Sequence, residues 1–124
     1  MTRILVVASQ REMRERIAAS LKDIDRPLAA VALRKDVVRM LDNIRQVLVY
    51  AAHEGGDAGW IANQMEEHSE LRVVYLSQNP WASLNYDRAR CMIAPINPAS
   101  LNSTLLHRMV LDLLAPVSQA VAHR

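Results

Sequence analysis

The sequence lacks several features that would assign a protein to a special class. It contains one cysteine, Cys91, which excludes an internal disulfide and suits a reducing compartment such as the cytoplasm. No apolar run approaches the roughly 20 residues that a membrane-spanning helix needs, and a strand-like run begins at Arg3, where a signal peptide would lie. We therefore expect a cytoplasmic protein without a membrane segment or a signal peptide.

Strong charge of one sign is also absent. Lysine and arginine together number 15 and aspartate and glutamate 13, so the net charge is +2, and only Lys22 and Lys35 are lysines. This small excess does not indicate direct binding of nucleic acid. Apolar residues make up 51% and charged residues 23% of the chain, as in ordinary globular proteins and unlike disordered ones.

A chain of 124 residues has the length of one domain. At this size about two-thirds of the surface of the unfolded chain is buried on folding, so a real hydrophobic core is expected. We assign 1–116 to one domain, because neither a repeat nor an internal linker interrupts it. Residues 117–124 then form a tail, or the start of a linker to an output domain outside this sequence.

The centre of the chain, from Gln46 to Gly59, carries the clearest fold signal. Its apolar run through Ala51 and Ala52 predicts a strand buried on both faces, as in a parallel sheet covered by helices on both sides. All three glycines of the protein lie in this stretch and permit a sharp turn at the carboxyl end of the strand. Ligands and catalytic groups gather at that edge in open α/β sheets. Here the strand tip offers only alanine, without an acid, a thiol or a metal ligand.

The same alternation runs along the whole chain. Strands are predicted at 3–8, 28–33, 46–51, 71–76 and 91–94, and the alanine-rich second strand is expected near an edge of the sheet. Helices are predicted up to about Asp25, over 35–44, after Asp57 and from Ala99 to about Ala115, while 78–90 has a weaker pattern. This order predicts a five-stranded, doubly wound parallel sheet with right-handed crossovers and helices on both faces.

Local signals predict how the helices begin and which side chains they bury. Ser9 and Glu12 have the spacing of a capping box, and Asp57 is expected to cap the third helix. Helical spacing predicts the buried side chains of the first three helices as Met13, Ile17, Leu21 and Ile24, then Val37, Val38, Leu41 and Ile44, then Trp60, Ile61, Met65 and His68.

The sequence resembles the receiver domain of bacterial response regulators. The resemblance consists of the alternation of strands and helices, together with Ser77 at the end of the fourth strand, Pro95 after the fifth and Gly59 near the third helix. This CheY-like family has a flavodoxin-type fold with strand order 2-1-3-4-5. The resemblance covers nearly the whole chain and implies a signalling role in a bacterial two-component system. In the family, the residue matched by Ser77 binds the phosphoryl group.

The residues that carry receiver chemistry are replaced in this sequence. Ala8-Ser9 stands where receivers have the acidic pair that holds Mg²⁺, and Ala51 stands at the position of the phospho-accepting aspartate. Ala94-Pro95 replaces the family's Lys-Pro, and Cys91 falls on its aromatic switch position. Metal ligands, nucleophile and lysine act together in phosphoryl transfer, so one serine cannot support the reaction. We interpret the chain as a degenerate receiver, or pseudo-receiver, that is not an enzyme and has neither a metal nor a cofactor.

Other polar residues have simpler structural explanations. His53, Glu54 and Asp57 share a loop, but loop residues of this kind are usually solvated. The hydroxyl of Ser77 more often caps a neighbouring backbone group than binds an anion. A lone Cys91 in a buried strand behaves as a small apolar residue.

Three classes of function remain to be compared. The first is an interaction module that forms a homodimer or docks on another protein or domain. The last helix supports it, because one row of apolar residues suffices to cover a sheet and a second row, Leu106, Val110 and Leu114, is left over. Trp81, after a turn in the weakly patterned segment, is the further interface candidate.

The second class is a small-molecule sensor whose ligand lies at the carboxyl edge of the sheet. Ala8, Ala51 and Ala94 would leave room there for such a ligand. The third class is an enzyme, and neither a Gly-rich phosphate loop, a nucleophile elbow nor a metal-ligand spacing supports it.

Overall fold

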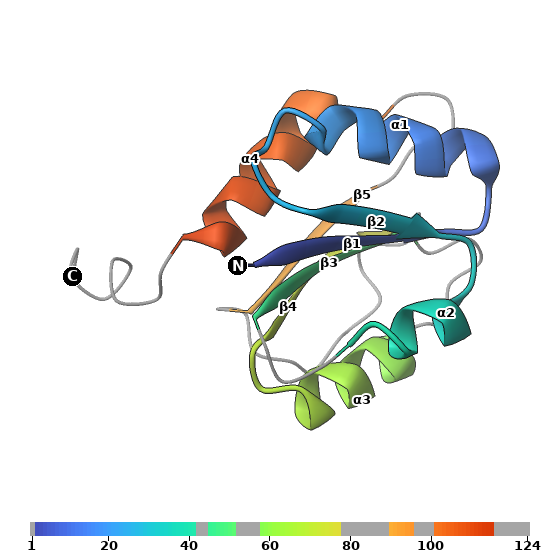
Figure 1. Cartoon of the computed structure of the whole chain (residues 1–124), viewed down its shortest axis with the longest axis vertical. Helices are drawn as coiled ribbons and strands as arrows, with labels where there is room; N and C mark the ends of the chain where they lie inside the picture. The colour runs from blue at the N-terminus through green and yellow to red at the C-terminus, as the bar shows by residue number, and fades with distance from the viewer. Residues whose placement is uncertain (1, 42–44, 52–57, 78–89, 96–100, 116–124) are drawn as a thin grey trace.

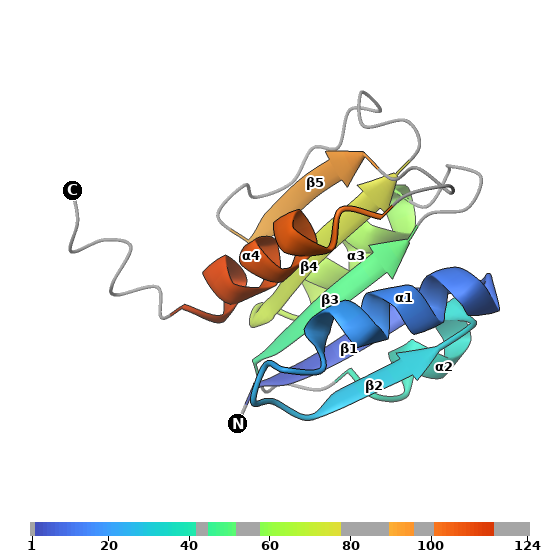
Figure 2. The same ribbon diagram turned by 90° about the horizontal axis from the view of Figure 1, so that it is seen from above.

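Five parallel strands form one sheet in the order β2-β1-β3-β4-β5. They are β1 (Arg3–Ala8), β2 (Leu28–Val31), β3 (Gln46–Ala51), β4 (Leu71–Ser77) and β5 (Cys91–Pro95). The computed structural model describes residues 2–41, 45–51, 58–77, 90–95 and 101–115. The predicted strand order is confirmed, and so is the edge position of the alanine-rich strand, which is β2. Figure 2 shows the strand arrows pointing to one common edge.

Helices cover both faces of this sheet (Figure 1). One face carries α1 (Arg11–Leu21) and α4 (Ser103–Leu114), and the other carries α2 (Arg34–Val38) and α3 (Ala58–Glu67). Each layer encloses its own apolar cluster, so β1, β3 and β4 are buried on both sides. This double cover is the physical reason that these strands read as continuous apolar runs.

The start of α1 differs from the prediction. The helix begins at Arg11 with Gln10 in extended conformation at its N-cap, and that residue makes no side-chain capping bond. Ser9 is exposed, and the Glu12 carboxylate accepts a hydrogen bond from Arg16 (2.7 Å) instead of reaching back. The predicted capping box is therefore wrong: its spacing is present, but Ser9 lies one residue too early to serve as the N-cap.

The ends of the first two helices also lie earlier than predicted. Helix α1 ends at Leu21 and not near Asp25, although Ile24 is still buried in the turn that follows. Helix α2 is five residues long, so Val38 lies at its solvent side with 42% exposure, while Val37 is fully buried. The inward position predicted for Val38 is wrong, and Ile44 lies outside the described residues.

The last two helices, α3 and α4, form in the parts of the chain where helices were predicted, but they differ from the prediction in detail. Ile61 and Met65 are buried on α3, whereas Trp60 and His68 are half-buried. Helix α4 begins at Ser103, because the Asn102 side chain caps it by accepting a hydrogen bond from the Leu105 backbone N–H at 3.0 Å. Residues 99 and 100, the glycines Gly55 and Gly56, and the proposed cap Asp57 lie outside the described ranges. Among the helices described, none has the length and apolarity that crossing a membrane requires.

The amino edge of the sheet carries a row of arginines that the sequence analysis missed. Arg3 opens β1, Arg45 directly precedes β3, Arg72 is the second residue of β4, and Arg90 directly precedes β5. Their guanidinium groups donate hydrogen bonds to backbone carbonyls at or just beyond the helix ends: Arg3 to Met40, Arg45 and Arg72 to Ala115, and Arg90 to Met65 and His68. Helices end at this edge because they run back against the strands. The arginines thus lie where the helix dipoles place negative partial charge.

Candidate functional site

The receiver positions meet at the carboxyl edge of the sheet. Backbone register pairs Ala8 of β1 with Ala51 of β3, Ala51 with Leu76 of β4, and Leu76 with Ala94 of β5. Near their carboxyl ends, four neighbouring strands therefore carry one line of small or apolar side chains. The structure brings together the three alanines predicted from sequence to replace acid, nucleophile and lysine.

This line belongs to the core and is not an open polar pocket. Ala8 is 1% exposed and Ala94 is 4% exposed, and both belong to the apolar cluster beneath α1 and α4. Ala51 is partly buried and packs against the same cluster. Carboxylate and ammonium groups at these positions would have to leave water, which costs several kcal/mol per ion unless each is paired.

Ser77 lies one residue beyond this line. It pairs in register with Pro95 and is buried. Because side chains alternate along a strand, Ser77 points to the opposite face from Leu76, toward the layer of α2 and α3. Ser9, the other hydroxyl of the family positions, is exposed. Ser77 therefore does not share a face with the alanine line.

A cation contacts the end of β1 where receivers place carboxylates. The Arg14 guanidinium on α1 donates a hydrogen bond from Nη1 to the Ala8 carbonyl oxygen at 2.9 Å, and this contact is partly buried. Within the part of the chain that the structure describes, no group of three His, Cys, Asp or Glu side chains could hold a metal ion. His53, Glu54 and Asp57 lie outside those residues. Among the described residues, the side chain at this point is positively charged, whereas the ligands of a magnesium ion are negatively charged.

An aromatic cluster lies under the same edge on the α2 and α3 side. Tyr50 and Tyr75 pair in register on β3 and β4 with ring centroids 6.1 Å apart, and Trp60 of α3 lies 5.3 Å from Tyr50. The Arg34 guanidinium stands 5.7 Å from the centre of the Trp60 ring. Cys91 is buried in the same layer. The sequence analysis missed this cluster, although the two tyrosines stand at matching positions before their strand ends.

The predicted interface row on the last helix is largely core. Leu106 is 1% exposed and Val110 is fully buried, so the expectation that they form a free surface is wrong. Leu114 is partly buried against the same cluster. The apolar side chains that α4 leaves exposed are Leu105 and Leu111. Trp81 lies outside the described residues.

A groove of about 420 Å³ lies between α4 and the connection from α1 to β2. It combines apolar and charged side chains, and its lining residues are Asp23, Ile24, Asp25, Arg26, His107, Leu111, Leu114 and Ala115. The Nε2 atom of His107 lies 3.4 Å from Oδ1 of Asp23 and links the two walls. Sequence reasoning missed this groove, because its walls come from segments about 85 residues apart.

Comparison with known proteins identifies the fold. No protein-family model matches the chain, and no curated protein matches it. Solved structures do match: a two component transcriptional regulator AraC from Clostridium phytofermentans has 15% sequence identity and a TM-score of 0.65, and the match covers 100% of both chains. A response regulator from Thermotoga maritima has 17% identity and a TM-score of 0.67 over 93% of this chain and 99% of its own. The chain therefore has the CheY-like receiver fold.

Proposed function

We propose that the chain is a receiver-like signalling module that works without phosphorylation, through contacts with other proteins or with a second copy of itself. One observation carries this proposal: alanines occupy three positions that match the receiver's metal-binding, phospho-accepting and lysine residues. Ala8 and Ala94 are buried, and Ala51, on the same register line, is partly buried. Phosphoryl transfer to a carboxylate needs a nucleophile, a divalent cation and positive charge on the developing phosphoryl oxygens. The alanines supply none of these groups.

Arg14 supports the same proposal from electrostatics. Its guanidinium lies on the Ala8 carbonyl at the end of β1, so a second, divalent cation at that point would meet like charge. On this view the module is not an enzyme and carries no metal or cofactor. It acts in the cytoplasm as the regulatory part of a larger bacterial signalling protein.

The surface of α4 is the proposed contact region. Its buried arc holds Leu106 and Val110, and its solvent side still exposes Leu105 and Leu111. Exposed leucines on one helix are suited to docking when polar groups surround them. The alternative of a small-molecule sensor at the carboxyl edge has less support, because Ala8 and Ala94 are packed in the apolar core.

Exposure to phosphoryl donors tests the first half of the proposal. The chain is incubated with acetyl phosphate and Mg²⁺, and separately with beryllofluoride and Mg²⁺, beside a phosphorylatable receiver as positive control. We expect an unchanged mass and unchanged amide chemical shifts near Ala51. An acid-labile phosphoryl adduct on this chain, or Mg²⁺-dependent shifts at that edge, would contradict phosphorylation-independent action.

A further inference from the structure

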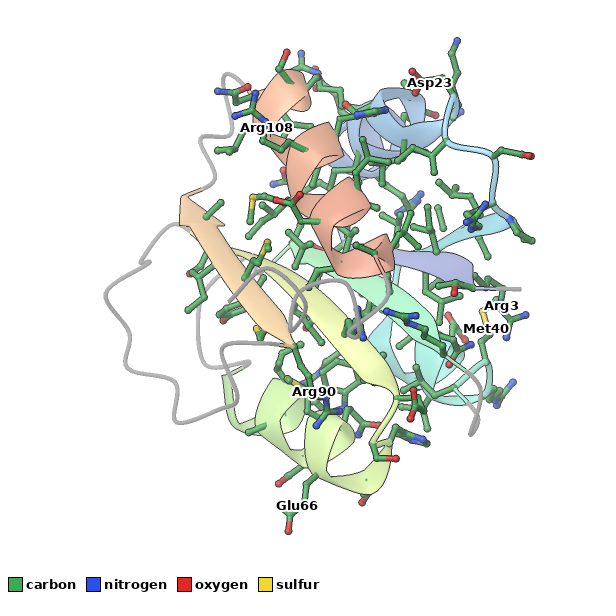
Figure 3. The ribbon with its side chains drawn as sticks, turned by 90° about the vertical axis from the view of Figure 1, so that its left-hand side faces the viewer. Arg3, Asp23, Met40, Glu66, Arg90 and Arg108 are labelled. Atoms are coloured by element: carbon green, nitrogen blue, oxygen red, sulfur yellow. The ribbon has the colours of Figure 1, made fainter. Side chains whose placement is uncertain are left out.

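Two guanidinium groups meet on one oxygen atom at the carboxyl end of α4. Nη2 of Arg45 and Nη1 of Arg72 both donate hydrogen bonds to the Ala115 carbonyl oxygen, at 2.6 Å and 3.0 Å. The Met40 carbonyl, just beyond α2, also accepts from two side chains. One of these donors is Arg3, which Figure 3 shows beside Met40, but the other is the neutral amide of Gln46. The end of α4 therefore differs in having two like charges on one acceptor.

These two charges have no carboxylate partner. Among the described residues, every hydrogen bond of Arg45 and Arg72 goes to a backbone carbonyl. Burial lowers the pKa of Arg72, the charges of Arg45 and Arg90 lower it further, and Glu70 raises it. Three guanidinium groups thus stand against one carboxylate and about half a negative charge at the end of α4. More than one positive charge is left uncompensated.

Both arginines keep N–H groups that the carbonyl oxygens do not use. Nε of Arg45 is buried without a hydrogen-bond partner, although the side chain as a whole is half-buried. Arg72 is 7% exposed, and in the described part of the chain only its Nη1 atom donates. A guanidinium group has five N–H donors, so an added acceptor is favoured at both side chains. Ala115 also lines the groove, through which solvent reaches this end of α4.

We propose that Arg45 and Arg72 together bind a compact dianion, the phosphate group of inorganic phosphate or of a small phosphate monoester, at the carboxyl end of α4. Guanidinium groups bind phosphate oxygens through charge-assisted, often bidentate hydrogen bonds. Two negative charges match the uncompensated positive charge, whereas a carboxylate brings only one. The anion accepts from the unused N–H groups, so the carbonyls at the end of α4 keep their donors.

The proposed site lies at the amino edge of the sheet, opposite the alanine line. Arg45 directly precedes β3 and Arg72 belongs to β4, so an anion held by both connects the end of α4 to two strands. Binding of this kind is noncovalent and needs neither Mg²⁺ nor a nucleophile. It goes beyond the proposed function and does not depend on it.

A phosphate titration of the full chain, followed by amide NMR spectra, tests the site. At about pH 8, where phosphate groups are dianions, and at constant ionic strength, we expect saturable shifts of the Arg45, Arg72 and Ala115 amides that EDTA does not abolish. Sulfate should compete, whereas acetate should bind at least about tenfold more weakly because it carries one charge. A titration with adenosine monophosphate identifies the source: tighter binding than phosphate assigns the site to monoesters, and weaker binding to the free ion.

Two charge-neutralising variants should change the phosphate affinity in opposite directions. Arg45→Gln removes one cation while Ala115 keeps its bond from Arg72, so the fold should persist and the Kd should rise by about tenfold or more. Glu70→Gln removes the acid that acts on Arg72 and should lower the Kd by about twofold. Circular dichroism of each variant checks its fold.

Matched controls neutralise the same residue types elsewhere. Arg108→Gln on α4 and Glu66→Gln on α3 are exposed, and Figure 3 shows both residues well away from Arg3 and Met40. Each should leave the Kd unchanged. Shifts that grow linearly without saturation, equal weakening by Arg45→Gln and Arg108→Gln, or Mg²⁺-dependent shifts confined to the region of Ala51 would overturn the inference. The last of these results would also contradict the proposed function, whereas the first two would not affect it.

Discussion

Arg72 carries a charge into the protein interior. It is 7% exposed, and its Nη1 donates to the carbonyl oxygens of Leu113 at 2.7 Å and Ala115 at 3.0 Å. Burial lowers the pKa of Arg72, the neighbouring Arg45 lowers it further, and Glu70 acts in the opposite direction. A lowered pKa means that the charged form is less favourable in the folded chain than in the unfolded chain. Guanidinium groups stay charged near neutral pH, so Arg72 contributes this cost without any pH dependence between pH 5 and 9.

Removing that side chain tests what its hydrogen bonds contribute. We expect Arg72→Met to lower the free energy of unfolding by about 1–3 kcal/mol, because the Leu113 carbonyl loses its donor while Ala115 keeps Arg45. Urea denaturation measures this change. Relief of burial and of repulsion from Arg45 opposes the loss, so a variant more stable than wild type would show that the charge costs more than its hydrogen bonds contribute.

Asn102 and Ser9, near the starts of α4 and α1, allow a paired test of how much a side-chain cap stabilises a helix. Asn102 caps α4 through its side chain, whereas Ser9 makes no such contact at α1. Asn102→Ala should therefore cost about 1 kcal/mol of stability, and Ser9→Ala should change it by only a few tenths. Thermal and urea unfolding of the two variants compare them directly. Equal losses would mean that Ser9 does cap α1 in solution.

At the scale of the element, α4 shows that the spacing of apolar residues predicts a helix but does not decide which of its faces is buried. Leu105 and Met109, and Leu106 and Val110, form two rows with the same spacing of four, and either row can face a sheet. The structure buries the arc centred between Leu106, Met109, Val110 and Leu113, and exposes Leu105. The helix was predicted correctly, but its rotation depends on contacts with α1 and the sheet, which lie far away in the sequence.

The rotation of α4 has a direct test in two neighbouring residues. Val110→Asp puts an unpaired charge at a fully buried position and should destabilise the fold by about 3–5 kcal/mol. Leu111→Asp changes an exposed position and should alter stability by no more than about 0.5 kcal/mol. Chemical denaturation of both variants provides the measurement. A stable, well-folded Val110→Asp variant would place the buried arc elsewhere.

At the scale of the whole molecule, topology was the most predictable property. Continuous apolar runs identified β1, β3 and β4, and their spacing by helices predicted a parallel sheet whose observed order is β2-β1-β3-β4-β5. The alanine line was also predictable, because it needs only the ends of those strands. The groove, the Arg14 contact and the arginine row could not be predicted, because each joins residues through side-chain geometry that sequence spacing does not encode.

The sheet order also constrains how the chain folds as it is synthesised. The face of β3 and β4 beneath α4 includes Val49 and Val74, and its cover includes Leu106 and Val110. A nascent chain that has not yet released α4 from the ribosome leaves this apolar face open to water and to other chains. Native packing of β3 and β4 on this face therefore waits for α4, and premature termination before Ser103 is expected to yield an aggregating product.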